Sequence, residues 1–539
     1  MKISVSFNLQ RLVLIACFIL LGVGIFMRFH NITKDDFFLY DEGYYLNYNH
    51  LFVNLWTYAP PSDWDEWKQS LLVWFRFSMA SGKALWFLLI DSRIFFGGLK
   101  VFFFPRVVSA IAGSLALWVT YLFSKKIFNS KWVGILSAVF LAILPSHVFY
   151  SRLAFQEALS TVFFISGFYF YVFPQQLNRR TFISAVLLVG AYFTNYRLVI
   201  IPALVAFCEF ITSVTAKRRP DFRKYVWHTL TFLFFIIMIG NIDMKENALV
   251  TYSWMLHQAD MAQEQLSFIN VFSYPYYLFT LESFWFGLLF LGNIYYGYKK
   301  EWPKIFPFAM VCFQMMIFSL TAEKAARYLC VVTPFMAMAV ASLLVDFIEQ
   351  KKEMTLRVAG IILCLLTTAT LLLKSNQIVF ARSDYKPSIE YLLANDPNAK
   401  ILSTQPWVQN LYVTNKKNVQ ECPHKFEQFL AYYTKGFRYL ILCPQSYISW
   451  TKDEKRFTPQ LETYLGFIAT QVKPAKTFSH LDRVMLERFV FDHNENLIQS
   501  IIFLNSANRH LGEIRVYDME TIIAKVNQWM SQQKKVNSN

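Results

Sequence analysis

A series of long apolar segments occupies the first 380 residues of the chain and constrains its fold more than any other feature. There are about eleven of them, each near the length that a helix needs to cross the hydrocarbon core of a bilayer. The composition agrees, because 55% of the residues are hydrophobic and only 16% are charged, which is too apolar for a soluble protein. The sequence therefore predicts a mainly α, polytopic membrane protein. The segments lie near residues 11–28, 102–123, 132–149, 157–173, 181–194, 198–214, 225–241, 275–297, 305–320, 328–346 and 357–373.

Short basic loops indicate how these segments are oriented. A cytoplasmic N-terminus puts all of the loops at the end of this paragraph on the inner side, where Lys and Arg accumulate. No small-residue cleavage site follows the first segment, so we interpret it as a retained span. The net charge of +16 is divided among short clusters, which argues against a nucleic-acid partner. The loops contain Lys125/Lys126/Lys131, Arg179/Arg180, Lys217/Arg218/Arg219/Arg223/Lys224, Lys299/Lys300/Lys304 and Lys351/Lys352/Arg357.

The same alternation of sides places four stretches outside, at residues 30–101, 150–156, 242–274 and 321–327. The first of these loops is long, and its pieces LLVWFRFSMA (71–80) and ALWFLLI (84–90) are apolar but too short to span a bilayer. We therefore predict two helices that lie at the membrane interface.

Residues 381–539 differ from the rest, because they are polar and contain no spanning segment. With an odd number of spans before it, this part is predicted to be an extracytoplasmic domain that follows a membrane domain of residues 1–380. Alternating patterns indicate a small α/β fold, with strands at 399–404, 437–444, 483–491 and 514–519 and helices around 387–394, 460–470 and 520–530. Cys422 and Cys443 either stay free or form a disulfide, and no CxxC pair indicates a metal site.

The stretch LYDEGYYLNYN (39–49) places two adjacent carboxylates, Asp41 and Glu42, shortly after the first span. One interpretation is an ordinary solvated loop. The other is a functional site, because Tyr44 and Tyr45 crowd the pair between interface-seeking segments. A carboxylate with limited hydration can act as a general base if it remains ionised.

Several outer turns carry cations that membrane orientation does not require. Arg152 and Glu157 lie in SRLAFQEALS, Arg197 lies in TNYRLVIIP, and TAEKAARYLCVVTP contains Lys324, Arg327 and Tyr328. An anionic partner is the economical explanation for cations at this side. The alternatives are a snorkelling Arg152 and ion pairs with Glu157 or Glu323. If the last turn is helical, its Lys and Arg share a face at spacing i, i+3 and can bind one phosphate.

The sequence DWDE (63–66) offers the one candidate for a metal site. Asp63 and Asp65 form a D-x-D pattern that can bind a divalent ion bridging phosphates, although a bare tripeptide is a weak signal. We expect no required cofactor, with a divalent cation as the less favoured alternative.

Four stretches, in this order along the chain, resemble a known family. They are LYDEGYYLNYN, FPRVVSAIAGSLALWVTYLFSKKIF with Arg106, LPSHVFYSRLAFQEALSTVFF, and EKAARYLCVVTPFMAMAVASLL. Together they are similar to the polyprenyl-phosphate-sugar-dependent membrane glycosyltransferases of the protein O-mannosyltransferase and aminoarabinose-transferase type, which have the GT-C fold. The resemblance covers most of residues 1–350.

The resemblance implies an enzyme that takes a hexosyl- or pentosyl-type sugar from a lipid-linked monophosphate at the outer membrane face and transfers it with inversion. Asp41 matches the family's base, and Glu42 matches the acid beside it. Arg152, Arg197, Lys324 and Arg327 match basic positions near the carrier phosphate, and we add Tyr328, Glu157, Tyr44, Tyr45 and Arg106 as further site candidates. The implied location is a bacterial cytoplasmic membrane.

The acceptor remains open among a protein, a lipid and a glycan. The chain has fewer spans than the aminoarabinose transferases, lacks the lumenal trefoil domain of eukaryotic protein mannosyltransferases, and lacks a WWDYG-like signature of oligosaccharyltransferases. A polytopic transporter or lipid flippase is the main alternative, although no matched pair of broken helices is visible in two halves. A non-catalytic exterior receptor is a third.

Overall fold

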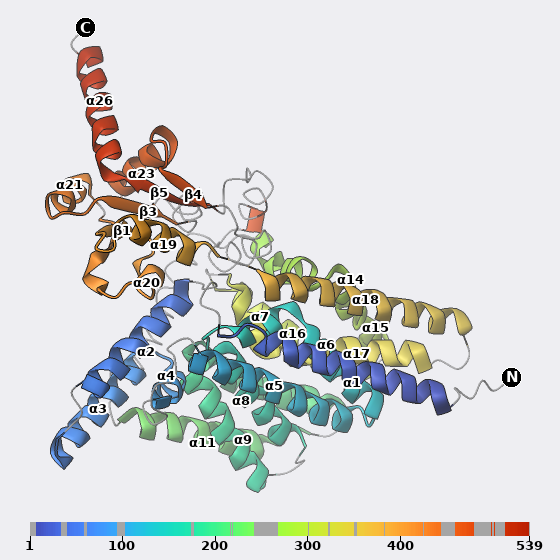
Figure 1. The fold of residues 1–539 in the computed structure, drawn as a ribbon. Coiled ribbons are helices and arrows are strands. Elements are labelled where there is room, and N and C mark those ends of the chain that lie inside the picture. Colours follow the sequence, from blue (N-terminus) through green and yellow to red (C-terminus); the bar gives the residue numbers. More distant parts are fainter. Residues whose placement is uncertain are drawn as a thin grey trace. The chain divides into compact units, whose positions relative to one another are not determined.

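In the computed structural model, most of the described residues lie in helices (Figure 1). The chain divides into two compact units. The first unit contains Met1–Thr33 and Asn49–Phe380, and the second contains Lys34–Tyr48 and Ala381–Asn539. The residues described are 7–33, 40–58, 62–93, 103–173, 177–215, 217, 219–241, 268–299, 301–321, 324–349, 353–381, 383–423, 425–443, 459–478, 497–498, 501 and 513–537.

The first unit, called the membrane unit below, is helical throughout the residues described. Each of the expected apolar segments contains helix, and Figure 1 shows α1, α5, α6, α17 and α18 packed side by side. The elements are α1 (Phe7–Phe29), α2 (Tyr40–Tyr58), α3 (Trp64–Ala80), α4 (Ala84–Asp91), α5 (Phe103–Ile127), α6 (Lys131–Ile143), α7 (Pro145–Arg152), α8 (Glu157–Val172), α9 (Arg179–Thr194), η2 (Tyr196–Ile200), α10 (Ile201–Thr215), α11 (Phe222–Asn241), η3 (Phe268–Phe272), α13 (Ser273–Tyr277), η4 (Leu278–Glu282), α14 (Phe284–Gly292), α15 (Ile294–Tyr298), α16 (Trp302–Ser319), η5 (Ala326–Val332), α17 (Thr333–Glu349) and α18 (Met354–Phe380).

Five helical segments in the described part of the chain are long and apolar enough to cross a membrane, and a bent pair makes a sixth. The sequence pattern predicted about eleven spans. The difference arises because several apolar segments form short or interrupted helices. The segment near 275–297, for example, is divided among α13, η4, α14 and α15. The protein is an integral membrane protein, and the finer count of spans stays a prediction.

The bent pair consists of α6 and α7, which meet at an angle of 58°. Pro145 begins α7 and cannot donate to the preceding turn, so the last carbonyl groups of α6 need other donors. Arg28 of α1 supplies them, because its guanidinium donates to the carbonyl oxygens of Ala142 at 2.7 Å and Leu141 at 3.1 Å. It also donates to Nδ1 of His147 at 2.6 Å. The fully buried Arg28 therefore stabilises the break with its positive charge at a helix C-terminus.

The second unit, called the C-terminal unit below, contains a five-stranded sheet in the order β2-β1-β3-β5-β4. Strand β1 is parallel to β2 and β3, whereas β5 is antiparallel to β3 and β4. Helices α23 and α26 pack on it through Leu465, Ile468 and Ile522. The elements are α19 (Tyr385–Asn395), β1 (Ile401–Ser403), α20 (Pro406–Gln409), η6 (Lys416–Asn418), β2 (Val419–Glu421), α21 (Phe426–Thr434), β3 (Tyr439–Leu442), α23 (Pro459–Gln471), β4 (Lys476–Phe478), β5 (Ile514–Asp518) and α26 (Met519–Asn537).

The strands expected at 399–404, 437–444 and 514–519 correspond to β1, β3 and β5, and the one at 483–491 lies outside the described residues. Cys422 and Cys443 are free. They follow β2 and β3, which lie on opposite sides of β1. Two strand spacings are about 9 to 10 Å, which exceeds the reach of a disulfide.

Candidate functional site

The acidic pair begins a helix, whereas the sequence analysis treated residues 39–49 as a loop. Asp41 lies in the first turn of α2, and Glu42 beside it is fully buried. The residues of α2 up to Tyr48 belong to the C-terminal unit. The start of α2 is therefore held by the sheet-containing part of the chain.

Two contacts fix the start of α2 against α20. A Cβ added to Gly43 would lie 2.8 Å from Cγ2 of Val408, so only glycine permits this close approach. One turn later, the Asn47 amide donates to the carbonyl oxygen of Trp407 and accepts from Nζ of Lys416 at 3.2 Å. Tyr45 is buried in this region, and Tyr44 is exposed.

Three cations of the membrane unit, Lys83, Arg197 and Arg327, act electrostatically on the buried Glu157 and are called the basic cluster below. All three cations interact electrostatically with the Glu157 carboxylate, which is only 1% exposed. The Gln156 amide donates to Oε1 of Glu157 at 3.0 Å, whereas Oε2 has no hydrogen-bond partner among the residues that the structure describes. The sequence analysis missed Lys83.

Backbone contacts explain how the distant members of the basic cluster meet. Gly82 has a φ of 68°, a conformation that glycine adopts easily, and its carbonyl oxygen accepts from the Tyr196 amide at 3.1 Å. This bond ties the turn before α4 to the start of η2, and so brings Lys83 near Arg197. Element η5 packs on α8, where Thr161 Oγ1 donates to the Cys330 carbonyl oxygen at 3.3 Å. The only sequence signal for Lys83 was a Gly-Lys turn between two apolar helices.

Tyr328 belongs to the same region. The Arg197 guanidinium lies 4.9 Å from the centre of the Tyr328 ring and 5.1 Å from that of Tyr196, distances at which cation–π attraction operates. Tyr328 is buried against Phe318, with ring centroids 5.0 Å apart. The arrangement holds the Arg197 charge in a fixed position inside the membrane unit.

The condition under which Lys324 and Arg327 would share a helical face is not met. Element η5 begins at Ala326 after an extended Ala325, so Lys324 lies outside the helix. Lys324 is buried and its carbonyl oxygen accepts from the Tyr277 hydroxyl at 2.7 Å, whereas Arg327 is half-buried. Glu323 lies outside the described residues.

Arg152 and Arg106 donate to carbonyl oxygens. Arg152 donates to Met27 and, at 3.3 Å, to Val379, which lie in the last turns of α1 and α18. Arg106 is buried and donates to the carbonyl oxygen of Ile32 at 3.4 Å. These bonds place both charges near helix C-termini, where cations are stabilised. A role of either residue at a phosphate stays a prediction.

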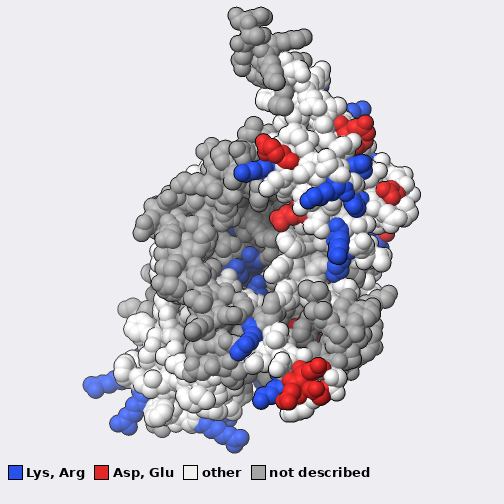
Figure 2. Space-filling model, turned by 90° about the vertical axis from the view of Figure 1, so that its left-hand side faces the viewer, with Lys and Arg blue, Asp and Glu red and all other residues white. Residues whose placement is uncertain are grey.

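The DWDE stretch forms an exposed acidic patch at the start of α3 (Figure 2). Asp63 accepts from the Glu66 amide at 2.8 Å and so caps the helix, while Glu66 accepts from Ser62. Asp65 is exposed. Within the described ranges, no three His, Cys, Asp or Glu side chains gather as metal ligands. Capping accounts for Asp63, and metal binding by Asp63 and Asp65 has no support beyond the sequence pattern.

Asp91 is a buried carboxylate that the sequence analysis did not consider. It ends α4 and accepts from the Asn49 amide at 2.5 Å and from the Trp74 indole at 2.9 Å. Burial raises the pKa of Asp91 to about 6, although both hydrogen bonds and the nearby Arg93 lower it. Asp91 thus holds α2, α3 and α4 together.

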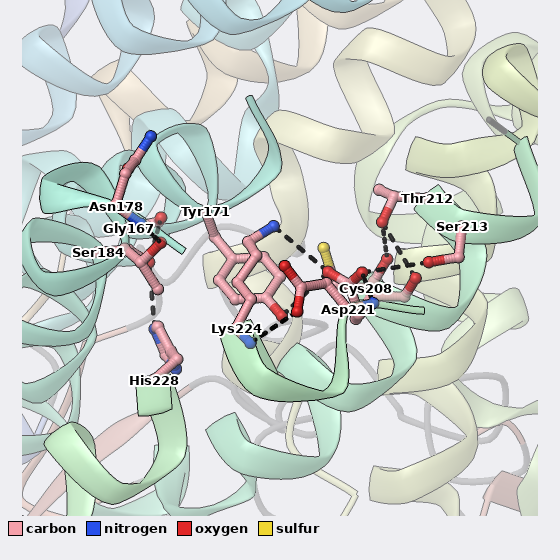
Figure 3. A network of polar contacts seen from close by, with 12 residues as sticks. Gly167, Tyr171, Asn178, Ser184, Cys208, Thr212, Ser213, Asp221, Lys224 and His228 are labelled. Carbon is pink, nitrogen blue, oxygen red and sulfur yellow. Dashed lines mark hydrogen bonds and ion pairs between the residues drawn. The ribbon is translucent and has the colours of Figure 1, made fainter. Parts of the chain in front are cut away.

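Another polar network lies among α8, α10 and α11 (Figure 3). Glu209 accepts from the Tyr171 hydroxyl at 3.2 Å, Ser213 at 3.1 Å, Lys224 at 3.3 Å and the Asp221 amide at 2.9 Å. Lys224 also lies 3.9 Å from the centre of the Tyr171 ring. Lys224, which was predicted to lie in an inner basic loop, therefore forms a buried ion pair with Glu209.

Comparison with known proteins identifies a family and several solved structures that this chain resembles. Residues 84–242, which include Glu157 and Arg197, match the family described as dolichyl-phosphate-mannose-protein mannosyltransferase. The apo oligosaccharyltransferase of Archaeoglobus fulgidus has a similar structure, with a TM-score of 0.55, 11% identity, and coverage of 85% of this chain and 73% of that one. The chain resembles the GT-C glycosyltransferases.

Two further structures are similar to this GT-C-like chain. The Archaeoglobus fulgidus enzyme tethered to an acceptor peptide has a TM-score of 0.51 and 11% identity, with 84% of this chain and 72% of that one covered. The Cupriavidus metallidurans ArnT bound to undecaprenyl phosphate has a TM-score of 0.47 and 12% identity, with 88% and 97% covered. No curated protein matches the chain in sequence.

Proposed function

We propose that this protein is a membrane glycosyltransferase that moves a sugar, with inversion, from a polyprenyl-phosphate donor to an acceptor on the outer side of the membrane. The electrostatic interaction of Lys83, Arg197 and Arg327 with the buried Glu157 carries the proposal. These residues come from distant parts of the sequence, so a local charge run does not explain their meeting. The resemblance of residues 84–242 to mannosyltransferases that use dolichyl-phosphate mannose supports the same donor class.

The proposed role of the basic cluster follows from the chemistry of the donor. When the bond between sugar C1 and the phosphate oxygen breaks, its electron pair stays on the phosphate, which leaves as a monoester with an additional negative charge. Fixed cations stabilise this charge without donating a proton. A buried site strengthens the effect, because the interaction is screened less than in water.

The proposed role of the acidic pair follows from the acceptor. A hydroxyl or amine that attacks C1 from the face opposite the phosphate must lose its proton, which inverts the configuration at C1. We assign the proton to Asp41 and a positioning role to the buried Glu42. One general base of this kind contributes about 10²- to 10⁴-fold to a rate.

A transfer assay tests this function. The full-length protein, purified and placed in lipid nanodiscs, is incubated in turn with several polyprenyl-phosphate sugars, beginning with polyprenyl-phosphate mannose, and a mixture of candidate acceptors. Release of polyprenyl phosphate is measured. We expect release that depends on the protein and on an acceptor. Asp41→Asn should lower the rate by about 10²-fold or more, because an amide cannot take up the proton.

The matched control is Asp65→Asn, which changes an exposed carboxylate of the same outer loop. It should retain wild-type release. Full activity of Asp41→Asn would remove Asp41 from the mechanism, and absence of release with every polyprenyl-phosphate sugar tried would overturn the proposed function.

A further inference from the structure

Two exposed aromatic rings, Tyr44 and Trp407, lie beside each other in the C-terminal unit and are called the aromatic pair below. Tyr44 is 43% exposed and Trp407 is 39% exposed, with ring centroids 5.8 Å apart at an interplanar angle of 83°. Neither the Tyr44 hydroxyl nor the Trp407 indole N–H donates a hydrogen bond within the described part of the chain. The pair therefore presents apolar ring surface and two polar donors at one place.

The sheet holds Trp407 in a defined position. Helix α20 follows β1, and its Gln409 accepts from Ser403 at 3.0 Å and donates to Sγ of Cys443 at 3.2 Å. Ser403 and Cys443 lie at the carboxyl ends of the parallel strands β1 and β3. Ligand sites of α/β folds commonly lie at this edge of a sheet.

Helix α2 links the aromatic pair to the acidic pair. Tyr44 follows Asp41 by three residues in the same helix, so the two positions share one face. The close approach of Gly43 to Val408 fixes this face relative to α20. A ligand on the aromatic pair therefore lies one helical turn from the proposed base.

The chemistry of this surface matches a sugar ring. One face of a pyranose presents C–H groups that stack on an aromatic ring, while its hydroxyls need polar partners at the ring edge. Asn47 and Lys416, joined at 3.2 Å, flank the aromatic pair and supply polar atoms there. A lipid chain would require a contiguous apolar surface, which these polar groups interrupt.

We propose that the aromatic pair is an acceptor subsite and that it binds a saccharide, with one pyranose ring stacked on Trp407. The proposal rests on the proposed glycosyltransferase function and narrows its acceptor to a sugar. The sugar belongs either to a free glycan or to the headgroup of a glycolipid, since both present the same ring.

The experiment compares acceptors in the full-length protein in nanodiscs, with polyprenyl-phosphate mannose as the donor. The acceptors are a free disaccharide, an alkyl glycoside of the same disaccharide, and a Ser- and Thr-containing peptide. Trp407→Ala should raise KM for a saccharide acceptor about tenfold, with kcat within about threefold of wild type.

Trp407→Phe should restore most of the affinity, because it keeps an aromatic ring. Activity with the free disaccharide would indicate a glycan as the source of the sugar. Activity only with the alkyl glycoside would indicate a glycolipid.

Trp529→Ala is the matched control. Trp529 is 44% exposed in α26 and contacts Phe467, so it has similar exposure in the same unit. Its replacement should leave KM for every acceptor unchanged. Equal KM values for Trp407→Ala and wild type, as expected if the pair merely sits among lipid headgroups, would overturn the subsite. Exclusive use of the peptide would also overturn it.

Calorimetric binding of the free disaccharide without donor separates this inference from the proposed function. Binding that is lost in Trp407→Ala, together with no transfer from any donor, would retain the subsite and reject the transferase. Transfer to the peptide without disaccharide binding would retain the transferase and reject the subsite.

Discussion

Two buried glutamates of the membrane unit have opposite surroundings. Glu209 accepts hydrogen bonds from Tyr171, Ser213, Lys224 and the Asp221 amide. Glu157 accepts from Gln156 through one oxygen, and its other oxygen has no hydrogen-bond partner in the described part of the chain, although three cations act on it. A buried carboxylate whose oxygens both accept hydrogen bonds is fixed in place. A carboxylate that cations attract without hydrogen bonding to it can be displaced from them by another anion. The comparison separates a structural ion pair from a candidate ligand site.

The largest expected effect is on the Glu209 network. Lys224→Met should lower the free energy of unfolding by about 3 to 5 kcal/mol, because the buried Glu209 carboxylate would lose its cationic partner. Thermal unfolding in detergent measures the loss. The double variant Glu209→Gln with Lys224→Met should recover most of it. A single variant as stable as wild type would show that the ion pair is not structural.

The next effect concerns Asp91, which lies between the two glutamates in character, because it accepts hydrogen bonds from the uncharged donors Asn49 and Trp74. Burial raises the pKa of Asp91 to about 6 from an ordinary 3.8, so its proton stabilises the fold at low pH and this stabilisation is lost as the pH rises through 6. Asp91→Asn mimics the protonated form. The free energy of unfolding of Asp91→Asn should rise relative to that of wild type by up to about 3 kcal/mol as the pH increases from 4 to 7.

Unfolding midpoints of both proteins across this pH range measure the difference. Parallel curves for wild type and Asp91→Asn would mean that Asp91 titrates as it does in water.

A variant of Arg197 tests whether the basic cluster near Glu157 binds the donor phosphate. Arg197→Gln should raise KM for the polyprenyl-phosphate sugar about 10- to 100-fold, since a hydrogen bond from a charged donor contributes about 1.5 to 3 kcal/mol. Initial rates at varied donor concentration provide the measurement. Arg180→Gln is the control, because Arg180 is exposed at the opposite end of α9. An unchanged donor KM in Arg197→Gln would exclude Arg197 from the donor site.

The smallest effect is expected at Glu157. Its charge competes with a bound phosphate for the basic cluster, so Glu157→Gln should strengthen inhibition by the product polyprenyl phosphate about threefold. The inhibition constant measures this change. Weaker inhibition in Glu157→Gln would mean that the carboxylate positions the cations more than it competes with the anion.

The sequence pattern predicted the helices well, because apolar length leaves few alternatives in a membrane. It missed helix α2, whose YDEGYYLNYN start has no apolar stripe and is held by contacts with α20. It also missed β2 and β4, which have three residues each and depend on pairing with the neighbouring strands β1 and β5.

The candidate site was predictable only in part. Charges at outer turns directed attention to Arg197, Arg327 and Glu157, which interact electrostatically in the structure. Lys83 was not predicted, because the Gly82 hydrogen bond that brings it near Arg197 joins residues more than one hundred positions apart. The sequence could not decide whether Lys324 shares a helix with Arg327, and in the structure the extended Ala325 before η5 separates them. Local patterns identify residue types, whereas tertiary contacts decide which of them meet.

The bond from Arg28 to the Ala142 carbonyl oxygen also constrains how the protein is made, because its two ends are separated by 114 residues. During synthesis, α1 leaves the ribosome long before α6 exists. Until then its guanidinium can donate only to the Gly24 carbonyl oxygen of its own helix, to water or to lipid phosphate. We expect α1 to stay at the insertion site until α6 and α7 arrive, so biogenesis and not only the finished fold depends on this arginine.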